Sequence, residues 1–259
     1  MTVRSLPWAR LGQGAALAAL GGVMLHLALA DNYWMFLNPR FRWLTGSAGA
    51  ALLLLAVAAW LARGHRPAVS GGVVMALMAG LALGAQQATL PSAPEHTPLT
   101  GPTSVQEAAE TLEPRVTVDG VQYVRLNLAE LLAGTMPGSG IQAPQRLAVR
   151  GMAVRSPELD ARGEFALVRV QVVCCLADAV GVGFVVRQAP ELPEAGAWVE
   201  VCGALEPLGP TPLPRLTFPG VVGVLLGEGH AIAADHARPT DPPDIPFIFA
   251  MHDQEPFAY

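Results

Sequence analysis

Residues 44–62 read LTGSAGAALLLLAVAAWLA and contain no charged side chain. A helix rises about 1.5 Å per residue, so a run of this length comes close to spanning the roughly 30 Å hydrocarbon core of a bilayer. This stretch therefore predicts a membrane-spanning helix, and it is the strongest prediction of that kind in the chain.

Two further apolar runs flank this stretch. Residues 11–30 precede it and residues 69–90 follow it, and neither run contains an acidic or a basic residue other than histidine. A cleaved signal peptide would account for the first run alone. We therefore expect residues 1–90 to form a membrane anchor of two or three spans in contact with the lipid bilayer.

Arginines near these runs predict the orientation of the anchor. Arg4 and Arg10 precede the first run, and Arg63 and Arg66 follow the second. If each run crosses once, these four side chains share one face of the membrane, and short basic segments tend to stay in the cytoplasm. The loop between the first two runs also holds arginines, which oppose this assignment. On balance we expect a multi-pass protein of the inner cell membrane whose residues after 90 are extracytoplasmic.

The overall composition agrees with a chain that is partly membrane-embedded. It is 52% hydrophobic and only 14% charged, with a mean hydropathy of +0.39. Binding to nucleic acid requires an extended basic face, and a net charge of −5 leaves none. We therefore expect no nucleic-acid partner.

The second half of the chain has a different pattern. Residues 91–113 begin with PSAPEHTPLTGP, a composition typical of an extended linker. From residue 114 to residue 259 short alternating segments dominate. In VTVDGVQYVRL (116–126) the alternation is interrupted by Asp119 and Gly120, a dipeptide favoured in two-residue hairpin turns. The first hairpin of a β domain is predicted here.

A short helix and several strands are expected after this hairpin. LAELLAG (128–134) has helical spacing, and Gly134 is a plausible C-cap. Several short strands joined by Gly- and Pro-containing loops, without a repeating βαβ pattern, favour a small all-β barrel. We expect an OB-like barrel followed by an extended C-terminal tail. The strands are predicted over residues 145–154, 164–175, 181–188, 197–207 and, more weakly, 221–226.

The cysteines form the densest cluster of reactive side chains. Cys174 and Cys175 end the strand predicted over residues 164–175, Asp178 follows them, and Cys202 is the third cysteine. Neighbouring residues of a strand point to opposite faces. One thiol of the pair is therefore expected to face the barrel interior, unless the strand ends between them.

Three interpretations of these residues stay open. In the first, all three cysteines pack as small apolar side chains. In the second, Cys202 forms a disulfide with Cys174 or Cys175 in an oxidising compartment. In the third, Cys174, Cys175 and Asp178 hold zinc or another soft or borderline divalent metal, although no CxxC or HxxxH spacing supports such a site.

His26 is an ionisable residue inside the first apolar run. Such a side chain is costly in hydrocarbon unless it is paired or faces a polar cavity. Because small residues let helices approach closely, Gly21, Gly22 and His26 are candidates for a helix-packing seam. The alternatives are a neutral imidazole bonded to a backbone carbonyl and a face turned to lipid.

Three segments together resemble the YcgQ-like permease-subunit family. They are CCLADA (174–179), GAWVEVCGAL (196–205) and PPDIPFIF (242–249), which follow the apolar runs in that order. The resemblance implies membrane spans followed by a domain of unknown function. It also implies a partner, a large permease similar to the arsenic-efflux permeases. The positions that match the family pattern are Cys175, Ala177, Asp178, Trp198, Gly203 and Pro246.

One departure from this family affects the metal interpretation. Some relatives carry a histidine-rich loop between their spans, whereas this chain has only Arg63-Gly64-His65-Arg66 there. Any metal site would therefore have to be built around Cys174, Cys175 and Asp178. The departure weakens the inference of metal handling from the family.

These observations predict a non-catalytic accessory subunit of a membrane permease, with a possible relation to metal or metalloid transport. An enzyme is not expected, because no HExxH, P-loop or dinucleotide fingerprint is present and Asp178 would raise the pKa of a nearby thiol. Two alternatives are an extracytoplasmic thiol, redox or metal-binding protein and a structural membrane anchor.

Overall fold

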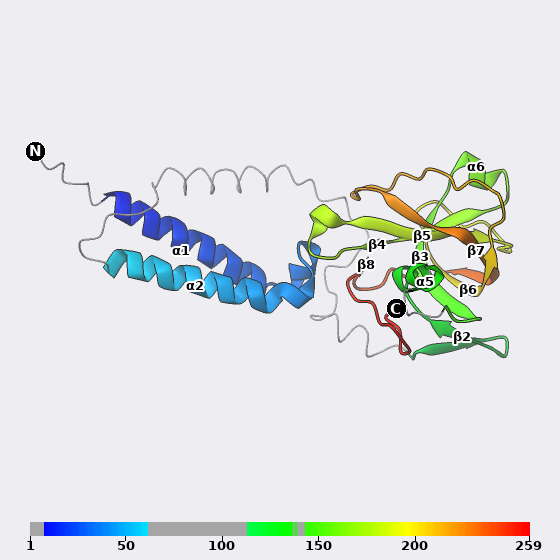
Figure 1. The fold of residues 1–259 in the computed structure, drawn as a ribbon, viewed down its shortest axis with the longest axis horizontal. Helices are drawn as coiled ribbons and strands as arrows, with labels where there is room; N and C mark the ends of the chain where they lie inside the picture. The colour runs from blue at the N-terminus through cyan, green and yellow to red at the C-terminus, as the bar shows by residue number, and fades with distance from the viewer. Residues whose placement is uncertain (1–7, 62–112, 137, 139–142) are drawn as a thin grey trace, which may run out of the picture. The chain divides into compact units, whose positions relative to one another are not determined.

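The computed structural model describes residues 8–61, 113–136, 138 and 143–259. The chain divides into two compact units, Met1–Ala93 and Pro94–Tyr259, called here the N-terminal unit and the β unit (Figure 1). The apolar run at 69–90 and nearly all of the predicted linker lie outside the described residues.

The N-terminal unit is a helical hairpin of α1 (Trp8–Leu29) and α2 (Arg42–Leu61). The two helices meet most closely at two glycines. A Cβ added to Gly21 would lie 2.8 Å from the carbonyl oxygen of Gly49, and one added to Gly49 would lie 2.9 Å from that of Gly21. Backbone contact of this kind is possible only where side chains are absent, so these two glycines set the distance between the helices.

The turn between the helices contains η1 (Asp31–Met35) and η2 (Pro39–Phe41). Arg42 donates from Nε to the Ala28 carbonyl at 2.6 Å and from Nη2 to the Ala30 carbonyl at 2.8 Å. The guanidinium thus satisfies carbonyls that the end of α1 leaves without helical partners. Arg42, one of the arginines that oppose the predicted orientation, thus has a structural role in the hairpin.

Among the described residues, one helix, Pro39–Leu61, is long and apolar enough to serve as a membrane anchor or a signal sequence. The neighbouring Gly14–Leu29 is a shorter apolar helix. The structure thus confirms an apolar, helical N-terminal region. The number of spans and the multi-pass topology stay predictions.

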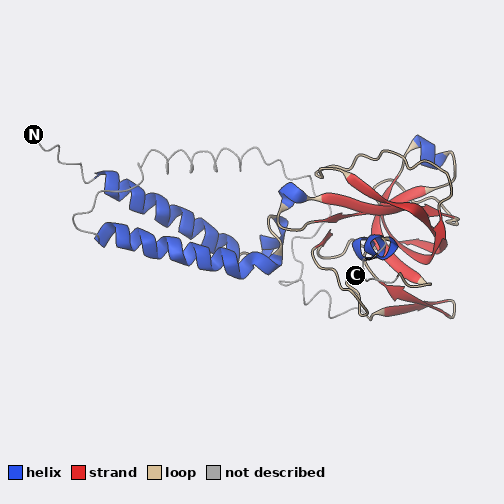
Figure 2. Ribbon diagram, in the orientation of Figure 1, coloured by secondary structure: helices blue, strands red, loops and turns tan. Residues whose placement is uncertain are grey.

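The β unit is built on one sheet with strand order β1-β2-β3-β6-β7-β5-β4-β8, in which β4 also pairs with β3. Strands β3, β6, β7, β5 and β4 therefore close into a five-stranded barrel, with β1 and β2 extending from β3 and β8 from β4 (Figure 2). The prediction of a small all-β barrel is confirmed. The strands are β1 (Arg115–Val118), β2 (Val121–Arg125), β3 (Leu147–Val154), β4 (Phe165–Gln171), β5 (Val180–Arg187), β6 (Trp198–Pro207), β7 (Val224–Pro239) and β8 (Phe247–Ile248).

Within the barrel, β5 and β7 run parallel and the other neighbours run antiparallel. The predicted hairpin is present, since β1 and β2 pair around Asp119 and Gly120, both of which have positive φ. Such angles are those of a type I′ turn, which glycine adopts without strain.

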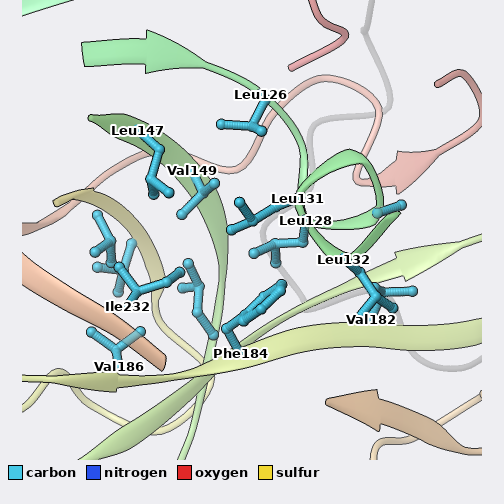
Figure 3. Packing of buried hydrophobic residues seen from close by; sticks show 14 of the residues in the cluster. Leu126, Leu128, Leu131, Leu132, Leu147, Val149, Val182, Phe184, Val186 and Ile232 are labelled. Atoms are coloured by element: carbon cyan, nitrogen blue, oxygen red, sulfur yellow. The ribbon is translucent and has the colours of Figure 1, made fainter. Parts of the chain in front are cut away.

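One apolar core fills the barrel. Side chains from α5 (Leu128–Thr135) and from strands β3, β5 and β7 converge on it (Figure 3). Leu128 and Leu131 of α5 and Phe184 of β5 have no exposed surface. Burial of each such side chain contributes about 1.5–3 kcal/mol. The helix starts with a capping box, in which the Asn127 side chain accepts from the Glu130 N–H and the Glu130 carboxylate accepts from the Asn127 N–H.

The structure corrects three predicted boundaries. Helix α5 continues past Gly134 to Thr135, and Met136 is its C-cap. Strand β4 ends at Gln171, before the cysteines, because Asp178 draws the next backbone N–H groups into a loop.

The third correction concerns β7, which extends far beyond the predicted residues 221–226 to Pro239. The glycines in this region disfavour a strand by local propensity. Tertiary packing overrides that tendency at Gly227, where an added Cβ would lie 2.1 Å from the Phe184 ring. The position admits only glycine because the two strands pack so closely there.

Candidate functional site

The cysteine loop, residues 172–179, connects β4 to β5 and contains the short helix η3 (Leu176–Asp178). Asp178 organises it: Oδ1 accepts from the Val173 N–H at 3.0 Å and Oδ2 from the Cys174 N–H at 2.8 Å. The sulfur atoms of Cys174 and Cys175 are 3.6 Å apart. Cys174 is exposed and Cys175 is half-buried. Strand β4 ends before both residues, so the alternation expected of a continuing strand, which would turn one thiol to the barrel interior, does not apply to them.

Hydrogen bonds within this loop determine which of its acidic groups are ionised at neutral pH. The bond to the Asp178 carboxylate, and next the contact with Cys175, raise the pKa of Cys174 to about 11. Burial opposes ionisation of Asp178, but bonds from the Cys174 thiol and the loop N–H groups outweigh it and lower the pKa of this carboxyl. At neutral pH the loop therefore holds a protonated Cys174 thiol beside an ionised Asp178, which is the opposite of an activated nucleophile.

Cys202 lies in a different part of the barrel. It is buried in β6 and packs with Tyr123 and Ala148 in a cluster that includes neither Cys174 nor Cys175. All three cysteines are free thiols. Burial raises the pKa of the Cys202 thiol to about 11, with the Glu200 charge as the next cause. Cys202 therefore behaves as an apolar packing residue.

The metal interpretation gains no further ligand from the structure. Within the part of the chain that the structure describes, no group of three or more His, Cys, Asp or Glu side chains is arranged to hold a metal ion. Both carboxylate oxygens of Asp178 already accept backbone hydrogen bonds. A site at Cys174, Cys175 and Asp178 stays a prediction and needs a ligand from elsewhere.

The remaining family-pattern positions have structural roles. Gly203 lies at a register shift between β6 and β7, where an added Cβ would be 2.0 Å from the Ala233 carbonyl oxygen. Trp198 is buried beneath the Arg169 guanidinium, whose Cζ is 5.9 Å from the ring centroid. The carbonyl of Pro246 accepts from Arg169 Nε at 3.1 Å. Ala177 is exposed in η3.

A polar cluster that the sequence analysis missed lies on the outer face of the barrel. The Glu200 cluster consists of Glu200, Arg150, Arg238, Tyr259 and Arg125. Glu200 is 3% exposed and accepts from Arg238 Nε at 2.9 Å and from the Tyr259 hydroxyl at 2.6 Å. Arg150 and Arg125 lie over the Tyr259 ring, with Cζ atoms 4.9 and 5.4 Å from its centroid. The Tyr259 ring thus has two cations within about 6 Å of its centroid.

Side chains of the barrel also hold the C-terminal segment, residues 245–259. The fully buried Glu130 accepts from the backbone N–H groups of His252 at 2.7 Å and Ala258 at 2.9 Å. Burial raises the pKa of Glu130, while these N–H bonds lower it in part. Arg169 donates to the carbonyls of Ile245 and Pro246, each at 3.1 Å. The segment is therefore an integral part of the β unit.

The sequence contains little signal for either of these arrangements. Glu200 alternates with Val199 and Val201, which is typical of a solvent-facing strand position. Its partners come from residues 38 and 59 positions away. Only the strand order and the return of the C-terminal segment to the barrel bring them together.

The predicted seam of Gly21, Gly22 and His26 is divided between two faces of α1. Gly21 packs against Gly49 of α2, whereas no atom lies within 4 Å of a Cβ added to Gly22. His26 is exposed on the surface of the hairpin. Gly22 and His26 therefore face away from α2.

Residues 142–217 match the model of the DUF1980 C-terminal domain. The matched region runs from β3 past β6 and contains the cysteine loop, Trp198 and Gly203. No curated protein and no solved structure matches the chain. The match is consistent with the resemblance to the YcgQ-like family, whose function is unknown, and it covers the family-pattern positions other than Pro246. Residues 142–217 are therefore similar to the DUF1980 C-terminal domain, a domain of uncharacterised function.

Proposed function

We propose that this protein is a non-catalytic accessory subunit of a membrane permease. The observation that carries the proposal is the pairing, in one chain, of a helix apolar enough to anchor in a membrane with a barrel whose interior is packed by apolar side chains. The buried charged groups of the described residues, Glu130, Glu164, Arg169 and Glu200, each have partners within the chain. Such a domain is suited to binding another protein rather than to transforming a substrate.

The barrel belongs, in this proposal, to the OB-like class. The closed ring of five strands and its single parallel pair, β5 with β7, support the assignment. OB-like barrels serve many functions, so the class does not identify a ligand. The binding surface has to be found on the outside of the barrel or on the anchor.

The partner is a permease similar to the arsenic-efflux permeases, and the β unit lies on the extracytoplasmic side as a gate or capture module. The anchor docks through the face of α1 that carries Gly22 and His26. An imidazole facing hydrocarbon is unfavourable, and a polar group on a neighbouring helix would relieve that cost. A relation of the transported species to metals or metalloids is part of the same proposal.

The test is purification of the tagged full-length chain from its native membranes in a mild detergent, followed by mass spectrometry. We expect a multi-span permease to co-purify in amounts similar to those of the chain. A Gly22→Leu variant probes the proposed docking face, because a Cβ added at Gly22 meets no atom of the described residues within 4 Å. It should keep the helical hairpin and lose most of the permease. Recovery of the chain with no membrane protein enriched over an untagged preparation would refute the proposal.

A second candidate function is that of an extracytoplasmic thiol or redox protein. It is favoured by one observation, the 3.6 Å separation of the Cys174 and Cys175 sulfur atoms. Counting free thiols under oxidising and reducing conditions tests it independently of any permease.

A further inference from the structure

The two neighbouring thiols of the cysteine loop lie on the same side of the backbone. In a regular strand, side chains of consecutive residues point to opposite faces and could not meet. Strand β4 ends at Gln171 and Cys174 lies in a bend beyond it, so the strict alternation of a strand does not hold there, and the sulfur atoms of Cys174 and Cys175 lie 3.6 Å apart. This separation requires only a modest further approach to reach the roughly 2.05 Å of a disulfide bond.

Cys174 and Cys175 are accessible to solvent and lie apart from the third cysteine. Cys174 is exposed and Cys175 is half-buried, so a reagent in solution reaches them. Cys202, the remaining cysteine, is 1% exposed and packs in a separate apolar cluster. Within this chain, the natural disulfide partner of Cys174 is therefore Cys175.

We infer that Cys174 and Cys175 form a reversible disulfide with each other, so that the cysteine loop is a thiol-oxidation site whose oxidant is a protein or small-molecule disulfide. This inference goes beyond the proposed accessory function and does not depend on it. It also differs from a disulfide to Cys202.

The reaction is a thiol–disulfide exchange in two steps. The Cys175 thiolate attacks one sulfur of the oxidant and expels its other half as a thiolate, leaving a mixed disulfide on Cys175. Cys174 then loses its proton to solvent and attacks Cys175 Sγ, which expels the second half of the oxidant. The loop has lost two electrons and two protons, and the oxidant has become two thiols.

Backbone geometry makes this disulfide easy to reduce. The Cα atoms of neighbouring residues are about 3.8 Å apart across a trans peptide, whereas ordinary disulfides join Cα atoms about 4.4–6.8 Å apart. The bond therefore stores strain, and strained, exposed disulfides are the labile and regulatory ones. Reversibility follows from this strain.

Asp178 controls the rate of this step as a positioning residue. By accepting the Cys174 hydrogen bond it keeps that thiol protonated, with a pKa of about 11. Oxidation removes the thiol proton and therefore this bond. The loop is tied to its neighbours through backbone bonds from Val172 to Ile248 at 3.0 Å and from Val222 to Ala179 at 2.9 Å.

The test is a thiol count on the full-length protein in detergent, equilibrated with mixtures of reduced and oxidised glutathione and then denatured, alkylated and weighed by mass spectrometry. We expect three alkylated cysteines under reducing conditions and Cys202 alone under oxidising conditions, with the loss of two hydrogen atoms from the peptide that holds Cys174 and Cys175. In the matched control, Cys202→Ser, the free thiols of Cys174 and Cys175 should disappear under oxidising conditions in the same way. Cys174→Ser and Cys175→Ser should each form no disulfide within the chain, because the remaining loop thiol then has no neighbour to pair with.

Two results would overturn the inference. One is three free thiols in the most oxidising mixture, and the other is a disulfide that contains Cys202. The role of Asp178 is tested separately by the rate of oxidation. The Asp178→Asn variant should form the disulfide about tenfold faster near neutral pH. Without the carboxylate a larger fraction of Cys174 is thiolate, and this gain outweighs the lower nucleophilicity of a more acidic thiol. An unchanged or slower rate would show that Asp178 does not control the step, whereas the thiol count still decides whether the disulfide forms.

Discussion

Glu200 on β6 and Arg238 on β7 are paired across neighbouring strands, and Arg238 Nε donates to Glu200 Oε1 at 2.9 Å. Arg150 on β3 is the partner of Glu200 on the other side, with Nη2 3.8 Å from Oε2. A single buried carboxylate thus connects three strands of the barrel. The Tyr259 hydroxyl, which donates to Oε2 at 2.6 Å, adds the C-terminal segment to the same group.

Replacing this carboxylate by a neutral amide should destabilise the β unit. Glu200→Gln keeps the shape of the side chain but leaves Arg150 and Arg238 without a counter-charge, at an expected cost of about 1.5–3 kcal/mol. Tyr259→Phe removes one hydrogen bond and should cost less, about 0.5–1.5 kcal/mol. Pulse proteolysis in urea measures both free energies of unfolding. Equal costs for the two variants would contradict a central role for the Glu200 charge.

The same carboxylate predicts a pH dependence of stability. Burial alone would raise the pKa of Glu200, but the hydrogen bonds from Tyr259 and Arg238 and the positive charge of Arg238 outweigh it, so the folded-state pKa lies below the ordinary value. The unfolded chain therefore binds this proton more readily than the folded one. The contribution of Glu200 is complete above about pH 4.5 and is lost as the pH falls through the folded-state pKa. Urea midpoints measured between neutral and acidic pH should fall in the wild type and fall less steeply in Glu200→Gln.

Gly203 should be intolerant of any side chain. Its added Cβ would lie 2.0 Å from the Ala233 carbonyl oxygen, a backbone atom that cannot move without opening the β6–β7 pairing. We expect Gly203→Ala to cost more than about 4 kcal/mol, at the extreme of single-residue effects. Gly223→Ala is the control, since a Cβ there meets no described atom within 4 Å. A soluble, well-folded Gly203→Ala protein with wild-type urea stability would contradict the observed register.

The two adjacent glycines of α1 should behave differently. Gly21→Leu forces α1 away from Gly49, whereas Gly22→Leu points away from α2. A disulfide between introduced cysteines at Ala28 and Gly46 reports on the hairpin, because the two Cβ atoms would be 3.7 Å apart, within the usual range for a disulfide. The cross-linked peptide should form in the Gly22→Leu background and be strongly reduced in Gly21→Leu. Equal cross-linking in both would show that the Gly21–Gly49 contact does not hold the helices together.

Local patterns predict those parts of the fold that depend on neighbouring residues. The uncharged run at 44–62 coincides with α2, the Asp119-Gly120 turn with the β1–β2 hairpin, and the alternating segments with the main strands. Each of these signals depends on side-chain periodicity or on the backbone freedom of one dipeptide. Local patterns fail where residues outside the strand intervene: Asp178, in the loop that follows β4, binds the backbone after that strand, and the pairing with β5 and β6 extends β7 through its glycines.

The same division holds for the candidate site. The sequence by itself determined that Cys174, Cys175 and Asp178 share one short segment, because they are neighbours in the chain. Only the tertiary structure decided that the Asp178 carboxylate is occupied by backbone N–H groups, that the two sulfur atoms lie on one side, and that Cys202 is remote from them. The Glu200 cluster depends on the strand order and on the position of the C-terminal segment. A charged strand residue has no local preference for burial, and Glu200 is buried because β3, β7 and the C-terminal segment bring Arg150, Arg238 and Tyr259 around it.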